Sequence, residues 1–132
     1  MFELQTAVVT ALKASAAVQA LLGADARVYD DHPVDIPVMP YVTVGEFVTA
    51  PFDTKTSIGR EATVSLHVWS SYRGRKEAEQ VLKAIYDVLH RQTLTVSGYS
   101  FILGQFIGSE SFIDADGITR HGVCRFRFTL DQ

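Results

Sequence analysis

Histidines are the residues of this chain with the widest chemical range, and they stand at positions 32, 67, 90 and 121. No two are four residues apart, the helical spacing that brings two imidazoles to one zinc ion in metalloproteases. Asp30, Asp31 and His32 form a run of possible ligands, but adjacent residues seldom point at one ion. His67 is expected on a strand and His90 near a helix end, where its charge suits the helix dipole. We therefore expect structural or surface roles for the histidines, and no metal site.

The other possible chemical motifs are also incomplete. Asp114–Gly117 resembles the start of a calcium loop, but Ile118 and Arg125 occupy its fifth and twelfth positions, and the twelfth requires a glutamate. An Asp-Gly hairpin turn explains that segment better. No serine lies in a G-x-S-x-G elbow, and no glycine loop is followed by the Lys-Ser/Thr of a phosphate site. Glutamates 46, 61 and 110 are scattered singly, so we predict neither an enzyme nor a cofactor.

A basic cluster is the remaining candidate site. Arg120, Arg125 and Arg127, together with His121, are predicted to lie on the outward side of the last strand. One interpretation is a solvated face. The other is an interface in which these arginines bind acidic groups of another subunit, a contact that suits the planar guanidinium. Acidic candidates for that contact are Asp30, Asp31, Glu46 and Asp53.

Composition limits the class of protein. The 132 residues are 47% hydrophobic and 20% charged, as expected for one globular domain spanning residues 1–132. The net charge of −3 argues against a dedicated nucleic-acid binder. Cys124, the single cysteine, is expected to be a buried thiol. The amino terminus carries Glu3 and Lys13 and is expected to be a helix of the fold, neither a signal peptide nor a membrane span.

A strand followed by a helix is the central unit that would position these groups. Ala62–Trp69 alternates apolar and polar residues with the period of a strand, and Lys76–His90 has the apolar spacing of an amphipathic helix. Both must bury one face, so the helix is expected to lie across its own sheet. The predicted core is Val64, Leu66, Val68, Val81, Leu82, Ile85, Leu89, Phe126 and Phe128.

The remaining elements complete an α+β fold, a mostly antiparallel sheet packed against the amphipathic helix and amino-terminal helices. We predict helices over Phe2–Ala14 and Ala16–Leu22, and strands over Arg27–Tyr29, Tyr41–Val48, Leu94–Ser97, Tyr99–Phe112 and Thr119–Leu130. Prolines 33, 37 and 40 exclude a helix or central strand between the first two strands. Thr49–Arg60 is polar and is expected to be a long loop joining paired strands, either functional or mobile.

Four segments together resemble the bacteriophage tail-completion family, the small tail terminators of long-tailed phages, prophages and gene transfer agents. They are the amino-terminal helices with Gly23 and Arg27–Tyr29, then Pro40–Glu46, then Ser65–Ser70 leading through Gly74 and Glu77-Ala78, and finally His121–Phe128. Each is a packing or turn pattern, so their order and spacing carry the resemblance.

The resemblance implies a non-enzymatic assembly protein. Members form a ring, generally of six copies, that caps the tail tube, ends its growth and joins tail to head. The implied partners are other copies, the tail tube protein and a head–tail connector, first in the host cytoplasm and then at the head-proximal end of the virion tail. The loop residues Phe52, Asp53, Lys55 and Arg60 are expected to contact the tube. Another neck component, or a small binding module, remains an alternative.

Overall fold

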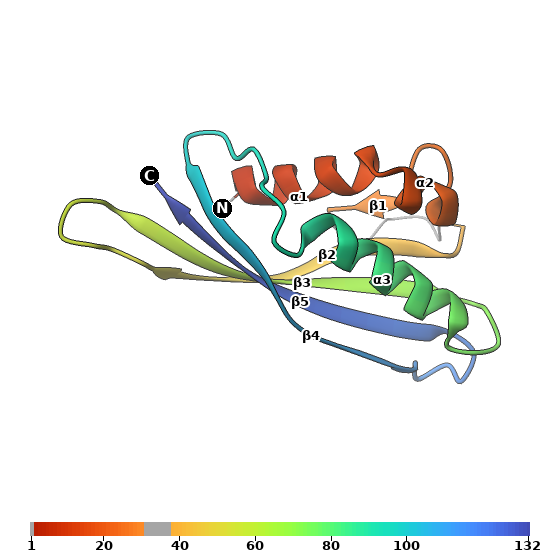
Figure 1. The fold of residues 1–132 in the computed structure, drawn as a ribbon. Helices are drawn as coiled ribbons and strands as arrows, with labels where there is room; N and C mark the ends of the chain where they lie inside the picture. Colours follow the sequence, from red (N-terminus) through yellow and green to blue (C-terminus); the bar gives the residue numbers. More distant parts are fainter. Residues whose placement is uncertain (1, 31–37) are drawn as a thin grey trace.

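A computed structural model describes residues 2–30 and 38–132 of the chain. Within them the order is α1 (Phe2–Ala14), α2 (Ala16–Leu22), β1 (Val28–Tyr29), β2 (Tyr41–Pro51), β3 (Gly59–Ser70), α3 (Lys76–Leu89), β4 (Ser100–Ile113) and β5 (Arg120–Asp131). The strands form one sheet in the order β1-β2-β3-β5-β4, in which only the β1–β2 pair is parallel. The helices lie on one side of this sheet (Figure 1), which confirms the predicted α+β fold.

Local sequence explains where the helices begin and end. Ser15 separates α1 from α2, and its Oγ accepts a hydrogen bond from the backbone N–H of Val18 at 3.3 Å, the N-cap predicted for it. Gly23 ends α2 with a φ of 90°, a conformation that favours glycine. No single described helix is long and apolar enough to cross a membrane; α1 and α2 meet that test only together, and the chain bends by 79° between them.

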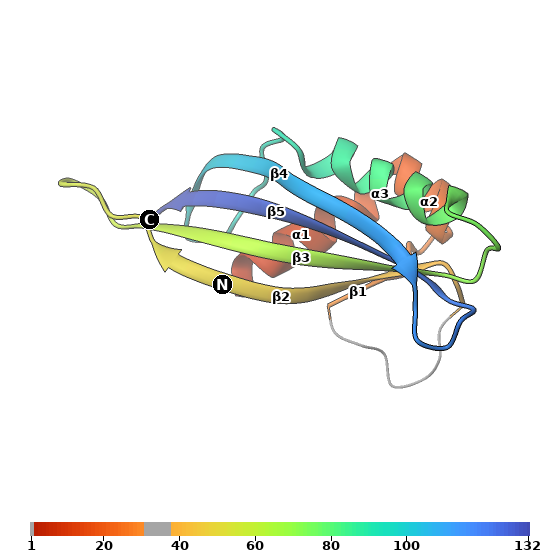
Figure 2. The ribbon, with the colours of Figure 1, turned by 90° about the horizontal axis from the view of Figure 1, so that it is seen from below.

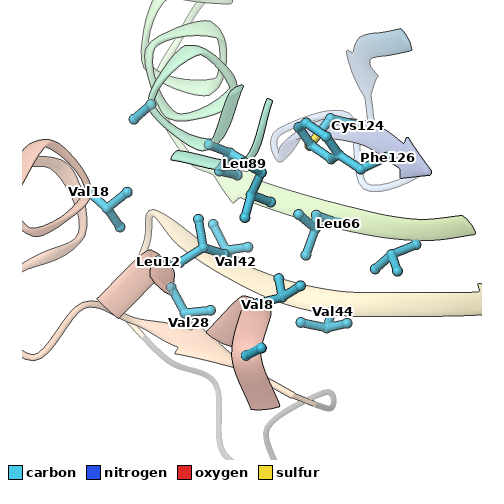
Figure 3. Packing of buried hydrophobic residues seen from close by; sticks show 14 of the residues in the cluster. Val8, Leu12, Val18, Val28, Val42, Val44, Leu66, Leu89, Cys124 and Phe126 are labelled. Atoms are coloured by element: carbon cyan, nitrogen blue, oxygen red, sulfur yellow. The ribbon is translucent and has the colours of Figure 1, made fainter. Parts of the chain in front are cut away.

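The core lies between the helices and the facing side of the sheet (Figure 3). Every residue of the predicted core is buried, none more than 5% exposed. The strand alternation accounts for this, because the even-numbered positions of β3 and β5 turn toward α3. Cys124 lies among them and is buried as predicted, and burial raises the pKa of its thiol to about 12.

The loop predicted over Thr49–Arg60 is shorter than expected. Strand pairing continues through Thr49↔Ala62 and Pro51↔Arg60, so the connecting loop contains only residues 52–58. Pro51 is compatible with the strand because β1 pairs only with Val42 and Thr43, which leaves the outer edge of β2 free at its end. The β2–β3 hairpin extends well beyond the layer of helices (Figure 1).

The strand predicted over Leu94–Ser97 was wrong. These residues have no strand pairing, although Leu94 and Val96 are buried. Their alternation reflects packing against the core without a neighbouring strand. By contrast, the Asp-Gly turn is confirmed: Gly117 has a φ of 73°, and its N–H donates to the carbonyl of Asp114.

Candidate functional site

The side of the sheet that faces away from the helices has no covering helix among the described residues (Figure 2). We call it the outer face; it carries the odd-numbered residues of β3 and β5. Arg125 and Arg127 lie there, as predicted. Arg125 Nη2 is 3.6 Å from Glu110 Oε1, and Arg127 Nε is 3.5 Å from Glu61 Oε1.

These two ion pairs are half-exposed. Exposed pairs of this kind contribute only about 0–1 kcal/mol, so either arginine could exchange its partner at little cost in stability. Their carboxylates come from neighbouring strands of the same chain, β3 and β4, and not from the acidic residues considered from sequence. The arrangement supplies two guanidinium groups that can bind an external carboxylate.

Arg120 does not share this face, which corrects the predicted three-arginine cluster. Its even number gives it the phase of the core residues of β5, and it lines a pocket with Gly74 and Arg75 at the start of α3. Its Nη2 donates to the Arg73 carbonyl at 3.5 Å, and its Nε is buried without a partner among the described atoms. The strand period alone could have predicted this position.

A second group on the outer face was missed by sequence reasoning. Glu46, His67 and His121 come from three strands and form one chain of contacts. His67 Nε2 lies 3.3 Å from Glu46 Oε2, and His67 Nδ1 lies 2.8 Å from His121 Nε2. The indole of Trp69 stacks on the His121 ring with centroids 3.9 Å apart.

Electrostatics follow from these contacts. The pKa of His121 is lowered, chiefly because burial penalises its charged form and secondly because His67 is close; Asp114, Glu110 and Glu46 act in the opposite sense. The pKa of Glu46 is also lowered, first by its own backbone N–H and then by the hydrogen bond with His67. The group is therefore best described as a hydrogen-bonded acid–imidazole chain.

His90 lies apart from this chain of contacts. His90 follows α3, and its Nδ1 accepts a hydrogen bond from the backbone N–H of Phe106 at 3.0 Å. This contact uses the lone pair on Nδ1. Asp31 and His32 lie outside the described residues. Within the described part of the chain, no three His, Cys, Asp or Glu residues are placed to hold a metal ion.

The hairpin tip contains three of the four predicted loop residues, Phe52, Asp53 and Lys55. Asp53 Oδ1 accepts from the backbone N–H of Gly59 at 3.2 Å, and Thr54 N–H donates to the Ser57 carbonyl at 2.9 Å. The fourth, Arg60, lies in β3 and pairs with Leu130 of β5, because the ladder continues further than the polar composition indicated. Phe52 and Ile58 expose apolar surface beside the tip.

Strand β4 forms one edge of the sheet and is unusually apolar there. It exposes Ile102, Leu103, Ile107, Phe112 and Ile113. Glu110 is its only charged residue, and it contains no proline. Proteins that remain monomeric commonly protect such an edge with lysine, proline or a covering element, although β4 does carry irregular register near Phe101 and Phe106.

Known proteins are similar to this chain in sequence and in fold. The family model described as tail completion protein gp17 matches residues 6–131. Gp17 of Bacillus phage SPP1 is 32% identical over 93 residues, which are 70% of this chain and 69% of that protein. The solved structure of SPP1 gp17 has a TM-score of 0.65 at 30% identity, covering 96% of this chain and 87% of that one.

A chain in the structure of the virion of a native gene transfer agent particle is also similar, with a TM-score of 0.89, 26% identity and coverage of 98% of this chain and 95% of that one. Fold and sequence together define a structural protein of phage and gene-transfer-agent virions. More particularly, the chain belongs to the tail completion protein gp17 family, which confirms the resemblance drawn from its four segments.

Proposed function

We propose that this protein caps the tail tube as a ring of six copies, the number general in the family it resembles, ends tube growth and forms the surface that joins tail to head. The observation that carries the proposal is the likeness over 98% of the chain to a component of an assembled gene transfer agent virion. The protein would meet the tube protein and a head–tail connector, first in the host cytoplasm and then at the head-proximal end of the tail.

Two surfaces support self-association. The apolar edge strand β4 and the outer-face arginines Arg125 and Arg127, which lie on the neighbouring strand β5, are two different groups on the same subunit. A contact between two different surfaces closes into a ring when the rotation between neighbours permits it. In this arrangement, Arg125 or Arg127 leaves its weak intrachain partner for a carboxylate of the neighbouring copy, while the hairpin tip with Phe52, Asp53 and Lys55 contacts the tube.

Charge reversal in complementation tests this function. Arg125→Glu with Arg127→Glu should leave the melting temperature nearly unchanged, since both side chains are half-exposed, and should give tails of uncontrolled length or unjoined heads. Lys83→Glu, on the exposed face of α3, is the matched control for reversing a surface lysine or arginine. Light scattering of the protein with tube protein measures the assembly directly.

A weak ring could require the tube end, so a monomer in dilute buffer does not decide the question. Normal particles from the well-folded double variant would contradict the role of the arginines. Normal tail length and head joining in particles that lack the protein entirely would contradict the proposed function itself, including the alternative of another neck component.

A further inference from the structure

A small pocket at one end of the molecule brings two arginine side chains together. It has a volume of about 240 Å³ and lies between the start of α3 and the end of β4, at the end of the sheet opposite the β2–β3 hairpin (Figure 1). Arg75, at the N-cap of α3, and Arg120, the first residue of β5, both line it. Edge strand β4 contributes Ser111, Phe112 and Ile113. Two positively charged groups therefore share one cavity beside a free strand edge.

Neither guanidinium has a carboxylate partner. Arg75 and Arg120 form no ion pair with any acidic residue among residues 2–30 and 38–132. The hydrogen bond from Arg120 Nη2 to the Arg73 carbonyl is 3.5 Å long, beyond the usual range of about 2.7–3.2 Å. Arg120 Nε is buried without an acceptor among the described atoms. A buried donor without an acceptor is unfavourable, so the pocket favours a ligand that supplies oxygens.

The first turn of α3 carries two glutamates, and both are bonded elsewhere. Glu77 Oε1 accepts from Ser70 Oγ at 2.7 Å, and Glu79 Oε1 accepts from Ser111 Oγ at 2.9 Å. Their charges disfavour a doubly charged phosphate more than a singly charged carboxylate, and the net charge of −3 disfavours a nucleic acid. The apolar rings and methyl groups of Phe112 and Ile113 suit the CH₂ stem of an acidic side chain. The chemistry therefore points to an aspartate or glutamate of a protein.

The opposite edge of the sheet carries acidic residues at the same level. Strand β1 lies at the edge opposite β4. One rung of the ladder runs from Val28 of β1 to Ser111 of β4 through the three strands between them. Asp25 and Asp30 flank β1, are exposed, and form no ion pair in the part of the chain that the structure describes. Each copy thus presents a basic pocket at one edge and free carboxylates at the other.

We propose that Arg75 and Arg120 form a carboxylate-binding pocket that takes Asp25 or Asp30 of a second copy of this chain. A cyclic ring keeps its copies at one level along the axis, so with the strands along that axis the β4 edge of one copy faces the β1 edge of the next at matching heights. A guanidinium fork binds a carboxylate through two parallel hydrogen bonds. The inference rests on the proposed ring and adds an ionic contact separate from that of Arg125 and Arg127.

Charge exchange in complementation tests the pocket. Arg75→Glu should keep the melting temperature of the parent, because the side chain is exposed and a carboxylate suits the start of a helix. It should lower the yield of complete particles about tenfold or more, because it places a glutamate opposite an aspartate. At least one of Asp25→Arg and Asp30→Arg should do the same. Combining that variant with Arg75→Glu should restore the yield to within about threefold of the parent, since the pair is re-formed with its charges exchanged.

Two further variants separate binding from structure. Lys76→Glu is the matched control, because it makes the same charge change at the adjacent exposed position without lining the pocket, and its yield should be normal. Arg120→Met keeps the length of the side chain and removes the buried, unpartnered donor. It should keep or raise the melting temperature while lowering the particle yield, whereas a purely structural arginine would lower the melting temperature instead.

Normal particles from Arg75→Glu or from Arg120→Met would overturn the proposal. Impaired particles that neither aspartate exchange restores would also overturn it, because the ligand would then belong to another protein. These failures would leave the capping function standing, since that function is tested by particles that lack the protein entirely.

Discussion

Phe126→Ala should be among the most destabilising single substitutions in this protein. Phe126 lies on β5, between β3 and β4 in the sheet, and is fully buried. Its ring makes an edge-on contact with Phe106, with centroids 5.5 Å apart, and lies beside Phe128 at 6.2 Å. Phe112 provides a matched control, because it is the same residue type on the neighbouring strand, yet is 44% exposed.

The expected magnitude follows from these surroundings. Truncating a fully buried phenylalanine costs about 3–5 kcal/mol, because apolar transfer energy is lost and a cavity remains. Small domains are stable by only about 5–15 kcal/mol, so this loss is a large part of the total. Phe112→Ala should cost about 1 kcal/mol or less, because its ring mainly contacts His121, with centroids 4.8 Å apart, at a surface open to water.

Urea unfolding followed by circular dichroism measures both changes. The midpoint should fall strongly for Phe126→Ala with little change in the slope of free energy against urea. Phe126→Leu, which keeps a large apolar side chain and leaves a smaller cavity, should cost less than Phe126→Ala. A loss below about 1 kcal/mol for Phe126→Ala, or an equal loss for Phe112→Ala, would refute the assignment of the buried and open faces of the sheet.

Two further predictions concern the exposed hairpin tip and the buried cysteine. Deleting Lys55 and Thr56 from the hairpin tip should leave the melting temperature nearly unchanged, because loop-tip backbone makes few native contacts. The deletion should nevertheless impair tail completion in complementation, since the tip is the proposed tube contact. Loss of folding, or normal tails, would contradict this prediction. Cys124 should resist thiol reagents at pH 8 until the protein unfolds, because its thiol is buried and its pKa is about 12; rapid labelling of the native protein would show that β5 is misassigned.

The spacing of apolar residues predicted most elements of this fold, because burying one face of a strand or helix sets that spacing directly. The alternation from Ala62 to Trp69 and the helical spacing from Lys76 onward each depend on one face turning toward the same core. The structure therefore confirms the predicted core as a set. The capping roles of Ser15 and Gly23 could also be predicted from the sequence, because capping depends on the local backbone and not on distant partners.

The errors occur where distant backbone pairing decides the structure. Thr49–Pro51 has the composition of a loop, yet it is paired with Arg60–Ala62 across the hairpin. Leu94–Ser97 has the composition of a strand but lacks a partner strand. Neither fact is contained in the composition of the segment itself, because a strand is defined by its neighbour as much as by its own residues.

The candidate site was less predictable for the same reason. Positions 46, 67 and 121 meet only through the β2–β3 register shift and the β3–β5 pairing. An antiparallel register that pairs Trp69 with His121 brings His67 close to His121, but sequence periodicity does not choose that register. Arg120 is a different case, since the alternation that correctly placed Phe126 and Phe128 already assigned it to their side of the strand.

The two faces of the sheet differ in what their residues contribute to stability. Substitutions on the helix side, such as Phe126→Ala, act on the core and should lower stability first. On the outer face, the ion pairs of Arg125 and Arg127 contribute little to stability, because water screens them. Charge reversal there should therefore leave the fold intact, so that any loss of assembly would report on the proposed interface alone. A sheet covered by helices on both faces could not offer this separation, because almost every strand residue would then belong to a core.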